Sequence, residues 1–93
     1  MTRYRAAIVG TGNIAHSHAR AIQQHSERVQ LVAAADVDPA RVEAFCQRYG
    51  GVRPYTEPAR MLAEERPDLV HICTPPHTHA DLSIQALEAG AWV

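Results

Sequence analysis

The chain has few cysteines and aromatic residues, and it contains no long apolar run. Its two cysteines, Cys46 and Cys73, lie within apolar patterns and form no close Cys-x-x-Cys pair, so we expect reduced, buried thiols. No apolar stretch reaches the length of a membrane span. Residues 1–5 run into the first predicted strand without the apolar segment of a secretory signal. We therefore expect a cytoplasmic protein.

Blocks of like charge are also absent, because nine basic and ten acidic residues are interspersed and give a formal net charge of −1. This balance gives no support to a nucleic-acid partner or to binding at an anionic membrane. With 46% hydrophobic and 20% charged residues, the composition is that of an ordinary globular protein. A length of 93 residues allows one compact unit with a modest core.

Short apolar runs alternate with helical patterns, and this alternation indicates parallel β-α-β units. The first predicted helix covers about residues 13–25. The predicted strands cover residues 4–9, 29–35, 52–55 and 69–73, and residues 91–93 have the pattern of the start of a fifth strand.

Capping residues and helix breakers define the other predicted helices. The second begins at Pro39, where a missing N–H is harmless, and has Asp38 as its N-cap. The third begins after Thr56, which we expect to be its N-cap. A fourth helix follows the Pro75-Pro76 pair. Each of the first four predicted strands is thus followed by a helix.

A glycine turn, Gly10-Thr-Gly12-Asn-Ile-Ala15, joins the first predicted strand to the first helix. Gly10 lets the chain turn sharply, and Gly12 removes the Cβ that would block a pyrophosphate. Ala15 is small enough for close packing of helix and strand. The backbone N–H groups of Asn13 and Ile14, at the positive end of the helix dipole, would face the phosphates. The alternative interpretation is a plain strand-to-helix turn that binds no ligand.

Asp36 follows the second predicted strand, at the distance where dinucleotide-binding folds place an acid that binds ribose. Its carboxylate would accept hydrogen bonds from the adenosine ribose and repel the extra phosphate of NADP. Arg41, one turn into the second helix, is either a partner for that phosphate or a solvent-facing residue. The sequence therefore predicts NAD as the cofactor and leaves NADP open.

The glycine turn, the acid and their flanking elements together predict one α/β domain. We expect a Rossmann-type doubly wound parallel sheet with strand order 3-2-1-4-5, incomplete at the C-terminus. Because the sequence ends inside the predicted fifth strand, we expect residues 1–93 to be a fragment of an NAD(P)-binding domain. A methyltransferase that uses S-adenosylmethionine is the competing interpretation on this architecture. Ile14, where that class usually has glycine, favours the dinucleotide.

The loop of residues 74–79 follows the fourth predicted strand, which this strand order places beside the first. It therefore borders the crevice where ligands bind. Thr74 would offer its hydroxyl to the cofactor, and Pro75 fixes the direction in which the chain leaves the strand. His77 and His79 lie where the next helix opens. From spacing alone, a turn cap at Thr74 and solvated histidines fit equally well.

The six histidines do not predict a metal site. His16 and His18 are two residues apart on a predicted helix, so their side chains point in different directions. No carboxylate or cysteine completes a tetrahedral set with His77 and His79. We interpret His71 as a strand histidine with its ring satisfied. The sequence also shows no nucleophile–base pair of the Ser-His or Cys-His kind.

With these residues in place, the whole chain resembles the N-terminal half of the glucose–fructose oxidoreductase / inositol dehydrogenase family, Gfo/Idh/MocA. The Thr-Pro-x-x-x-His loop after the fourth strand is its most specific feature. Four stretches carry the resemblance: Ala7-Ile-Val-Gly-Thr-Gly-Asn-Ile-Ala15 with His18-Ala19, Val32-Ala-Ala-Ala-Asp36, Asp68-Leu-Val-His-Ile-Cys-Thr-Pro-Pro-His-Thr-His79, and Ala86-Leu-Glu-Ala-Gly-Ala-Trp-Val93.

The resemblance implies a two-domain enzyme that moves a hydride between nicotinamide and a hydroxyl-bearing carbon of a sugar, inositol or related polyol. An N-terminal domain holds NAD or NADP, and a C-terminal α/β domain shapes the substrate site and a homo-oligomer. The cofactor-binding residues that it implies are Gly10, Gly12, Asn13 and Ile14 in the phosphate turn, Asp36 at the ribose, and Thr74, Pro75, His77 and His79 beside the cofactor.

The sequence departs from the family where catalysis would begin. In the family, the fifth strand leads to a Glu-Lys-Pro motif whose lysine assists proton transfer, but this sequence ends at Val93, before that motif. We therefore assign no catalytic residue within the chain. We expect the parent protein to be a dehydrogenase and the chain alone to be inactive. A non-catalytic dinucleotide-binding or sensor module is the alternative.

Overall fold

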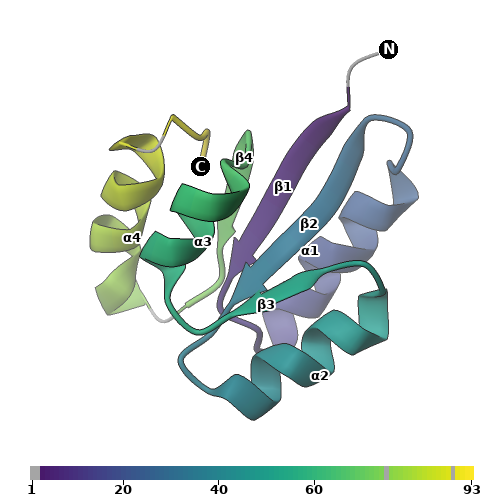
Figure 1. The fold of residues 1–93 in the computed structure, drawn as a ribbon, viewed down its shortest axis with the longest axis horizontal. Helices are drawn as coiled ribbons and strands as arrows, with labels where there is room; N and C mark the ends of the chain where they lie inside the picture. The colour runs from purple at the N-terminus through teal and green to yellow at the C-terminus, as the bar shows by residue number, and fades with distance from the viewer. Residues whose placement is uncertain (1–2, 75, 89) are drawn as a thin grey trace.

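Strands and helices alternate along the whole chain (Figure 1). The computed structural model describes residues 3–74, 76–88 and 90–93, apart from the side chains of 76–81. The elements are β1 (Tyr4–Val9), α1 (Asn13–Gln24), β2 (Val29–Ala35), α2 (Pro39–Tyr49), β3 (Arg53–Tyr55), α3 (Pro58–Glu65), β4 (Leu69–Ile72) and α4 (Pro76–Glu88).

The strands of the described residues form a parallel sheet in the order β3-β2-β1-β4. This matches the first four positions of the predicted order 3-2-1-4-5. The predicted fifth strand is present as an isolated parallel bridge between Leu69 and Trp92, on β4. The Trp92 N–H donates to the Asp68 carbonyl over 2.8 Å, and the Val70 N–H donates to the Trp92 carbonyl over 2.7 Å. The α/β class predicted from the sequence is therefore confirmed.

Helices cover both faces of the sheet, as the continuous apolar strands require. On one face, buried residues of α1 and α2 such as Ala19 and Phe45 pack against Ile8 of β1. On the other face, Met61 of α3 and Ala86 of α4 belong to a second buried cluster. The central strand β1 contributes to both clusters, because successive side chains point to opposite faces.

Several predicted boundaries differ from the structure: α1 ends at Gln24 and β4 at Ile72, each one residue earlier than predicted, and the starts of β3 and α3 also differ. Val52 is buried but precedes β3, which begins at Arg53. The prediction that Thr56 caps the third helix is wrong, because Glu57 occupies the N-cap position and makes no side-chain capping bond. Pro58 explains the shift: its fixed φ suits the first position of a helix, which places the cap on the residue directly before it. Asp38 does cap α2, and its carboxylate accepts from the N–H groups of Ala40 and Arg41.

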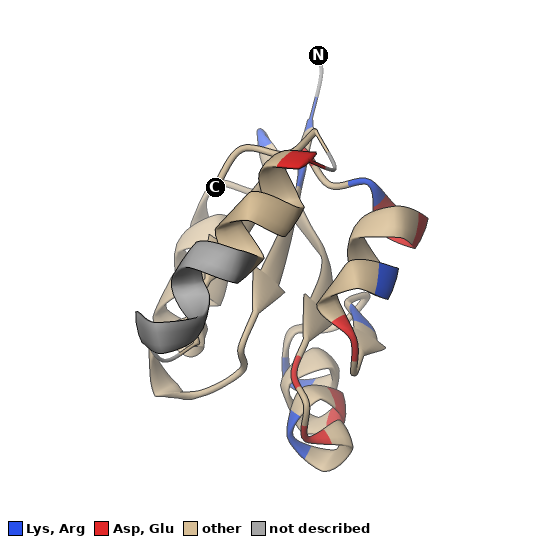
Figure 2. Ribbon diagram, turned by 90° about the vertical axis from the view of Figure 1, so that its left-hand side faces the viewer, with Lys and Arg blue, Asp and Glu red and all other residues tan. Residues whose placement is uncertain are grey.

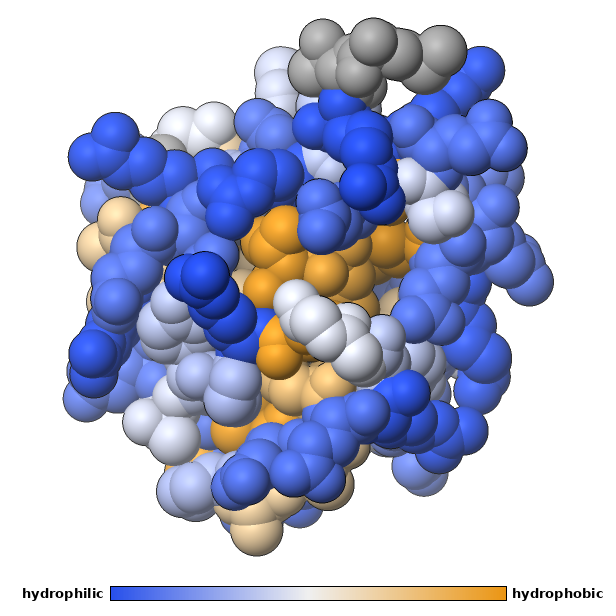
Figure 3. Space-filling view, turned by 45° about the vertical axis from the view of Figure 1, so that its right-hand side comes forward, coloured by the Kyte–Doolittle hydropathy of each residue, from blue (hydrophilic) through white to orange (hydrophobic). Residues whose placement is uncertain are grey.

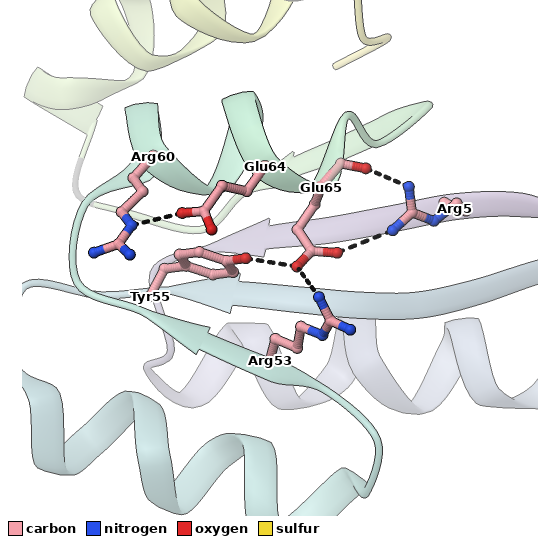
Figure 4. Close-up of polar contacts among 6 residues, drawn as sticks. All are labelled: Arg5, Arg53, Tyr55, Arg60, Glu64 and Glu65. Carbon is pink, nitrogen blue, oxygen red and sulfur yellow. Dashed lines mark hydrogen bonds and ion pairs between the residues drawn. The ribbon is translucent and has the colours of Figure 1, made fainter.

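A buried acidic residue, Glu65, connects α3 to the sheet through hydrogen bonds (Figure 4). Its side chain is only 3% exposed, and its Oε1 accepts from Arg5 of β1 at 2.9 Å. Its Oε2 accepts from the Tyr55 hydroxyl at 2.6 Å and from Arg53 at 3.4 Å, both on β3. Arg5 also donates to the Glu65 carbonyl. One carboxylate thus joins α3 to two strands that are not neighbours in the sheet.

The surface carries both signs of charge. Acidic and basic residues are interspersed along α2 and α3 (Figure 2), which agrees with the net charge of −1.

In the view of Figure 3, apolar residues show near the middle of the face and hydrophilic residues surround them. Among the described residues, no helix is both long enough and apolar enough to cross a membrane.

Candidate functional site

The loops after β1, β2 and β4 lie side by side at the carboxyl edge of the sheet. Backbone hydrogen bonds that continue the strand pairing hold them there. The Gly10 N–H donates to the Ala35 carbonyl and the Cys73 N–H to the Val9 carbonyl, each over 2.7 Å. This edge is where open α/β sheets bind ligands.

A hollow of about 820 Å³ opens between these loops. The structure brings seven of the predicted cofactor-binding residues to its wall: Gly10, Gly12, Asn13, Ile14, Asp36, Arg41 and Thr74. The other three predicted residues stay predictions, because Pro75 and the side chains of His77 and His79 lie outside the described part of the chain.

Gly10 is required by both its backbone angle and its neighbours. Its φ of +92° lies in the region that residues with a Cβ rarely adopt. A Cβ built there would lie 2.9 Å from the carbonyl carbon and oxygen of Cys73 and from Cγ2 of Thr74. The first glycine of the turn therefore lets the loop after β4 pass directly against the end of β1.

Gly12 has a different role, since a Cβ at this position would meet nothing within 4 Å. It is the N-cap of α1 and has no side chain to cap the helix. Asn13 and Ile14 are the first two helical residues, and N–H groups at such positions have no acceptor within their own helix. Open space, free N–H groups and the positive end of the helix dipole together suit an anionic group.

Asp36 is held by the glycine turn. Its side chain is 8% exposed, and its Oδ2 accepts from both the backbone N–H and the hydroxyl of Thr11, at 2.9 and 2.8 Å. Its Oδ1 accepts from the backbone N–H of Asp38 at 3.0 Å. The N–H of Asp36 itself donates to the Tyr55 carbonyl, which fixes the residue against β3.

The surroundings keep the carboxylate of Asp36 ionised. Burial raises its pKa, but the backbone N–H groups of Asp38 and Thr11 lower it, followed by the Thr11 hydroxyl and the charge of Arg41. The net effect is a pKa below the usual value of 3.8. A charged acceptor therefore lies at the rim of the hollow at neutral pH.

Arg41 faces the same carboxylate. Its Nη1 lies 3.9 Å from Asp36 Oδ2, and its side chain is 57% exposed. Arg41 is among the residues that line the hollow. A residue that lines the hollow and is also half-exposed fits both interpretations of Arg41, so its role stays a prediction.

Apolar side chains form a further part of the wall, and among them the sequence predicted only Ile14. Val37, directly after the acid, is 86% exposed, and Ile14 is 61% exposed. Pro58 and Leu82 complete this apolar wall. The sequence does show that an apolar residue, Val37, directly follows Asp36. Its exposure, however, cannot be predicted from the periodicity of the sequence, so its place in the wall was missed. Such surfaces suit the flat faces of an aromatic base.

The histidines of α1 contact different elements. Nδ1 of His16 lies 2.6 Å from the Tyr49 hydroxyl on α2, and burial with the nearby arginines lowers the pKa of His16. The ring of His18 lies 5.0 Å from the ring of His71 on β4. Burial, followed by the charge of His18, lowers the pKa of His71. In the part of the chain that the structure describes, no three His, Cys, Asp or Glu residues are grouped to hold a metal ion.

The hollow therefore fits a dinucleotide in three ways. It has room at Gly12 for a phosphate, an ionised acceptor at Asp36 for a diol, and exposed apolar walls for a base. Asp36 follows β2 and the N-terminus of α1 follows β1, which is the neighbouring strand. Thr11, in the loop after β1, donates to Asp36 and so links the two parts of the site.

Comparisons with known proteins agree with this geometry. Residues 4–93 match the model of an oxidoreductase family with an NAD-binding Rossmann fold. The chain is 32% identical over 89 residues to D-glucoside 3-dehydrogenase of Escherichia coli, covering 96% of this chain and 25% of that protein. It is 37% identical over 86 residues to inositol 2-dehydrogenase of Rhizobium meliloti, covering 92% of this chain and 25% of that protein. The chain thus spans about a quarter of the length of these relatives.

Solved structures of other dehydrogenases share the fold of this chain. The WlbA dehydrogenase of Bordetella pertussis, in complex with NADH and UDP-GlcNAcA, superimposes with a TM-score of 0.90 at 32% identity, over 96% of this chain and 27% of that chain. The scyllo-inositol dehydrogenase of Lactobacillus casei, with bound NAD(H) and scyllo-inositol, gives a TM-score of 0.85 at 28% identity, over 96% of this chain and 26% of that chain.

Proposed function

The chain belongs to the Gfo/Idh/MocA family of oxidoreductases with an NAD-binding Rossmann fold, and we propose that it forms the NAD-binding domain of a dehydrogenase. In this proposal the parent protein transfers a hydride between nicotinamide and a hydroxyl-bearing carbon of a sugar, inositol or related polyol. The observation that carries the proposal is the hollow at the carboxyl edge of the sheet, which joins the open space at Gly12 to the ionised Asp36.

Each part of the hollow has a proposed role in holding the cofactor. The N–H groups of Asn13 and Ile14 bind the pyrophosphate at the start of α1. Asp36 accepts hydrogen bonds from the adenosine ribose, and its charge favours NAD over NADP. Exposed Val37 and the other apolar wall residues cover the adenine. Thr74 belongs to the loop that passes against Gly10, on the side of β4.

The bound cofactor supplies the hydride chemistry, and the residues of this chain bind and orient it. Because the relatives are much longer than the chain, we place the substrate pocket, the acid–base groups and the contacts of a homo-oligomer outside the 93 residues. The chain alone would then bind cofactor without turning over substrate. We also propose a cytoplasmic location.

Titration of the purified protein with NADH, followed by nicotinamide fluorescence, tests the cofactor site. We expect saturable binding that Asp36→Ala weakens by about tenfold or more, because a charged acceptor is lost. The matched control is Glu43→Ala, which removes an exposed acid on α2 that does not line the hollow.

Two results would contradict the proposal. Absence of saturation in the unmodified protein removes the cofactor function, and equal NADH affinity in Asp36→Ala removes the role of the acid. Binding without dehydrogenase activity in the full-length protein would instead support a sensor module. A screen of sugars and inositols with NAD, monitored as NADH formation, distinguishes that outcome.

A further inference from the structure

Thr11 lies between the two glycines of the turn and is buried, with only 3% of its surface exposed. Buried polar groups in proteins almost always have a hydrogen-bond partner. Here both hydrogen-bond donors of the residue, the backbone N–H and the side-chain hydroxyl, donate to one atom, Oδ2 of Asp36. The two residues are separated by 25 positions, so the contact joins the loop after β1 to the loop after β2.

Because of this contact, the two oxygens of the Asp36 carboxylate have different numbers of donors within the protein. Each carboxylate oxygen has two lone pairs. The two donors of Thr11 fill those of Oδ2, whereas the backbone N–H of Asp38 takes one of the two on Oδ1. Oδ1 therefore retains acceptor capacity for a ligand hydroxyl.

Arg41 competes for the same oxygen that Thr11 holds. Its Nη1 lies 3.9 Å from Oδ2, at the outer limit of an ion pair and beyond hydrogen-bond distance. The side chain is long and 57% exposed, so little restrains it from moving closer. If the donors of Thr11 were missing, the carboxylate would be free to turn toward the guanidinium.

We propose that Thr11 is a positioning residue that holds Oδ2 of Asp36 against the attraction of Arg41, so that Oδ1 is left for the ribose diol and the site prefers NAD to NADP. The inference rests on the proposed cofactor function and adds a determinant of its specificity. Thr11 does not bind the cofactor itself in this proposal. It acts by keeping the ribose acid in one orientation.

The test compares Thr11→Val, which keeps the branched shape and loses the hydroxyl, with Thr11→Ser, which keeps the hydroxyl. Affinities for NADH and NADPH are measured by nicotinamide fluorescence. We expect Thr11→Val to weaken NADH binding by about tenfold, because a hydrogen bond to a charged group is lost. NADPH binding should change less, so that the preference for NADH falls, and Thr11→Ser should restore it.

A readout without ligand separates positioning from general damage. In a carbon NMR titration of Asp36, the carboxyl pKa should rise in Thr11→Val, since one hydrogen bond that lowers it is removed. It should return in Thr11→Ser. If Thr11→Val does not fold, Thr11→Ala makes the same comparison.

The possible outcomes separate the inference from the proposed function. An unchanged NADH-to-NADPH preference in Thr11→Val, or an equal loss for both cofactors that Thr11→Ser does not restore, overturns the positioning role. Failure of the unmodified protein to bind NADH overturns the proposed function itself, whatever the NMR titration shows for the contact between Thr11 and Asp36.

Discussion

Gly10→Ala is expected to impair folding, whereas Gly12→Ala is expected to impair NADH binding with little effect on folding. At Gly10, the φ of +92° costs a residue with a Cβ about 1–3 kcal/mol. The added Cβ would also lie 2.9 Å from the backbone of Cys73, and such overpacking costs roughly another 1–3 kcal/mol. Because about 1 kcal/mol moves the thermal midpoint of a small domain by about 4–8 °C, Gly10→Ala should lower it by at least about 8 °C.

At Gly12 the same substitution meets no atom within 4 Å, and the φ of −78° suits any residue. Loss of a favourable N-cap residue is the remaining cost, about 1 kcal/mol or less. The methyl group would, however, enter the space at the start of α1 that we propose for the pyrophosphate. NADH binding should therefore weaken by at least about tenfold, which corresponds to about 1.4 kcal/mol.

Thermal melts followed by circular dichroism and NADH titrations give the two quantities for each variant. The unmodified protein is the reference for both. Comparable loss of thermal stability in the two variants would refute the distinction between a packed and an open glycine. NADH affinity of Gly12→Ala equal to that of the unmodified protein would refute the position of the phosphate.

Three further predictions concern stability and reactivity. Glu65→Gln should lower the unfolding free energy by about 1–3 kcal/mol in chemical denaturation, because the buried carboxylate accepts hydrogen bonds from three residues. The control Glu64→Gln removes a half-exposed ion pair and should change the unfolding free energy by less than about 0.5 kcal/mol. The pKa of Asp36 is lower in the folded protein than its usual value of 3.8, so the ionised carboxylate stabilises the fold above pH 3.8. This stabilisation is lost as the pH falls through the folded pKa. In urea titrations, the difference in unfolding free energy between the unmodified protein and Asp36→Asn should therefore shrink from pH 7 to strongly acidic pH. Burial raises the pKa of Cys46 to about 11, so mass spectrometry should find this thiol unalkylated by iodoacetamide near pH 8 until the protein is denatured.

Features that depend on neighbours in sequence were predictable. The limits of β1 and β2 and the capping of α2 by Asp38 follow from apolar runs and from a capping residue before a proline. The glycine turn and Asp36 were predictable because their spacing follows from the geometry of one β-α-β unit. Thr56 was assigned as a cap from its residue type, but Pro58 determines where α3 starts.

Side-chain contacts between residues far apart in the sequence were not predictable, although the order of the strands was. Thr11 contacts an acid 25 residues away, and Glu65 contacts an arginine 60 residues away. Nothing in the local pattern distinguishes Glu65, which is buried, from Glu64, which pairs with Arg60 on the surface. The burial of a carboxylate is decided by the partners that the fold brings to it, and single-sequence periodicity does not contain them.

The main-chain hydrogen bonds that align the three loops have a consequence for how the site can change. They join Gly10 to Ala35, Asp36 to Tyr55 and Cys73 to Val9, and none of them involves a side chain. Side chains between these anchors can therefore be exchanged while the outline of the hollow is kept. Val37 and Arg41 are two of the exposed positions on this outline, so a different nucleotide could be selected by altering them while the backbone stays unchanged. The backbone frame and the side chains that would recognise a ligand are thus separate parts of the domain.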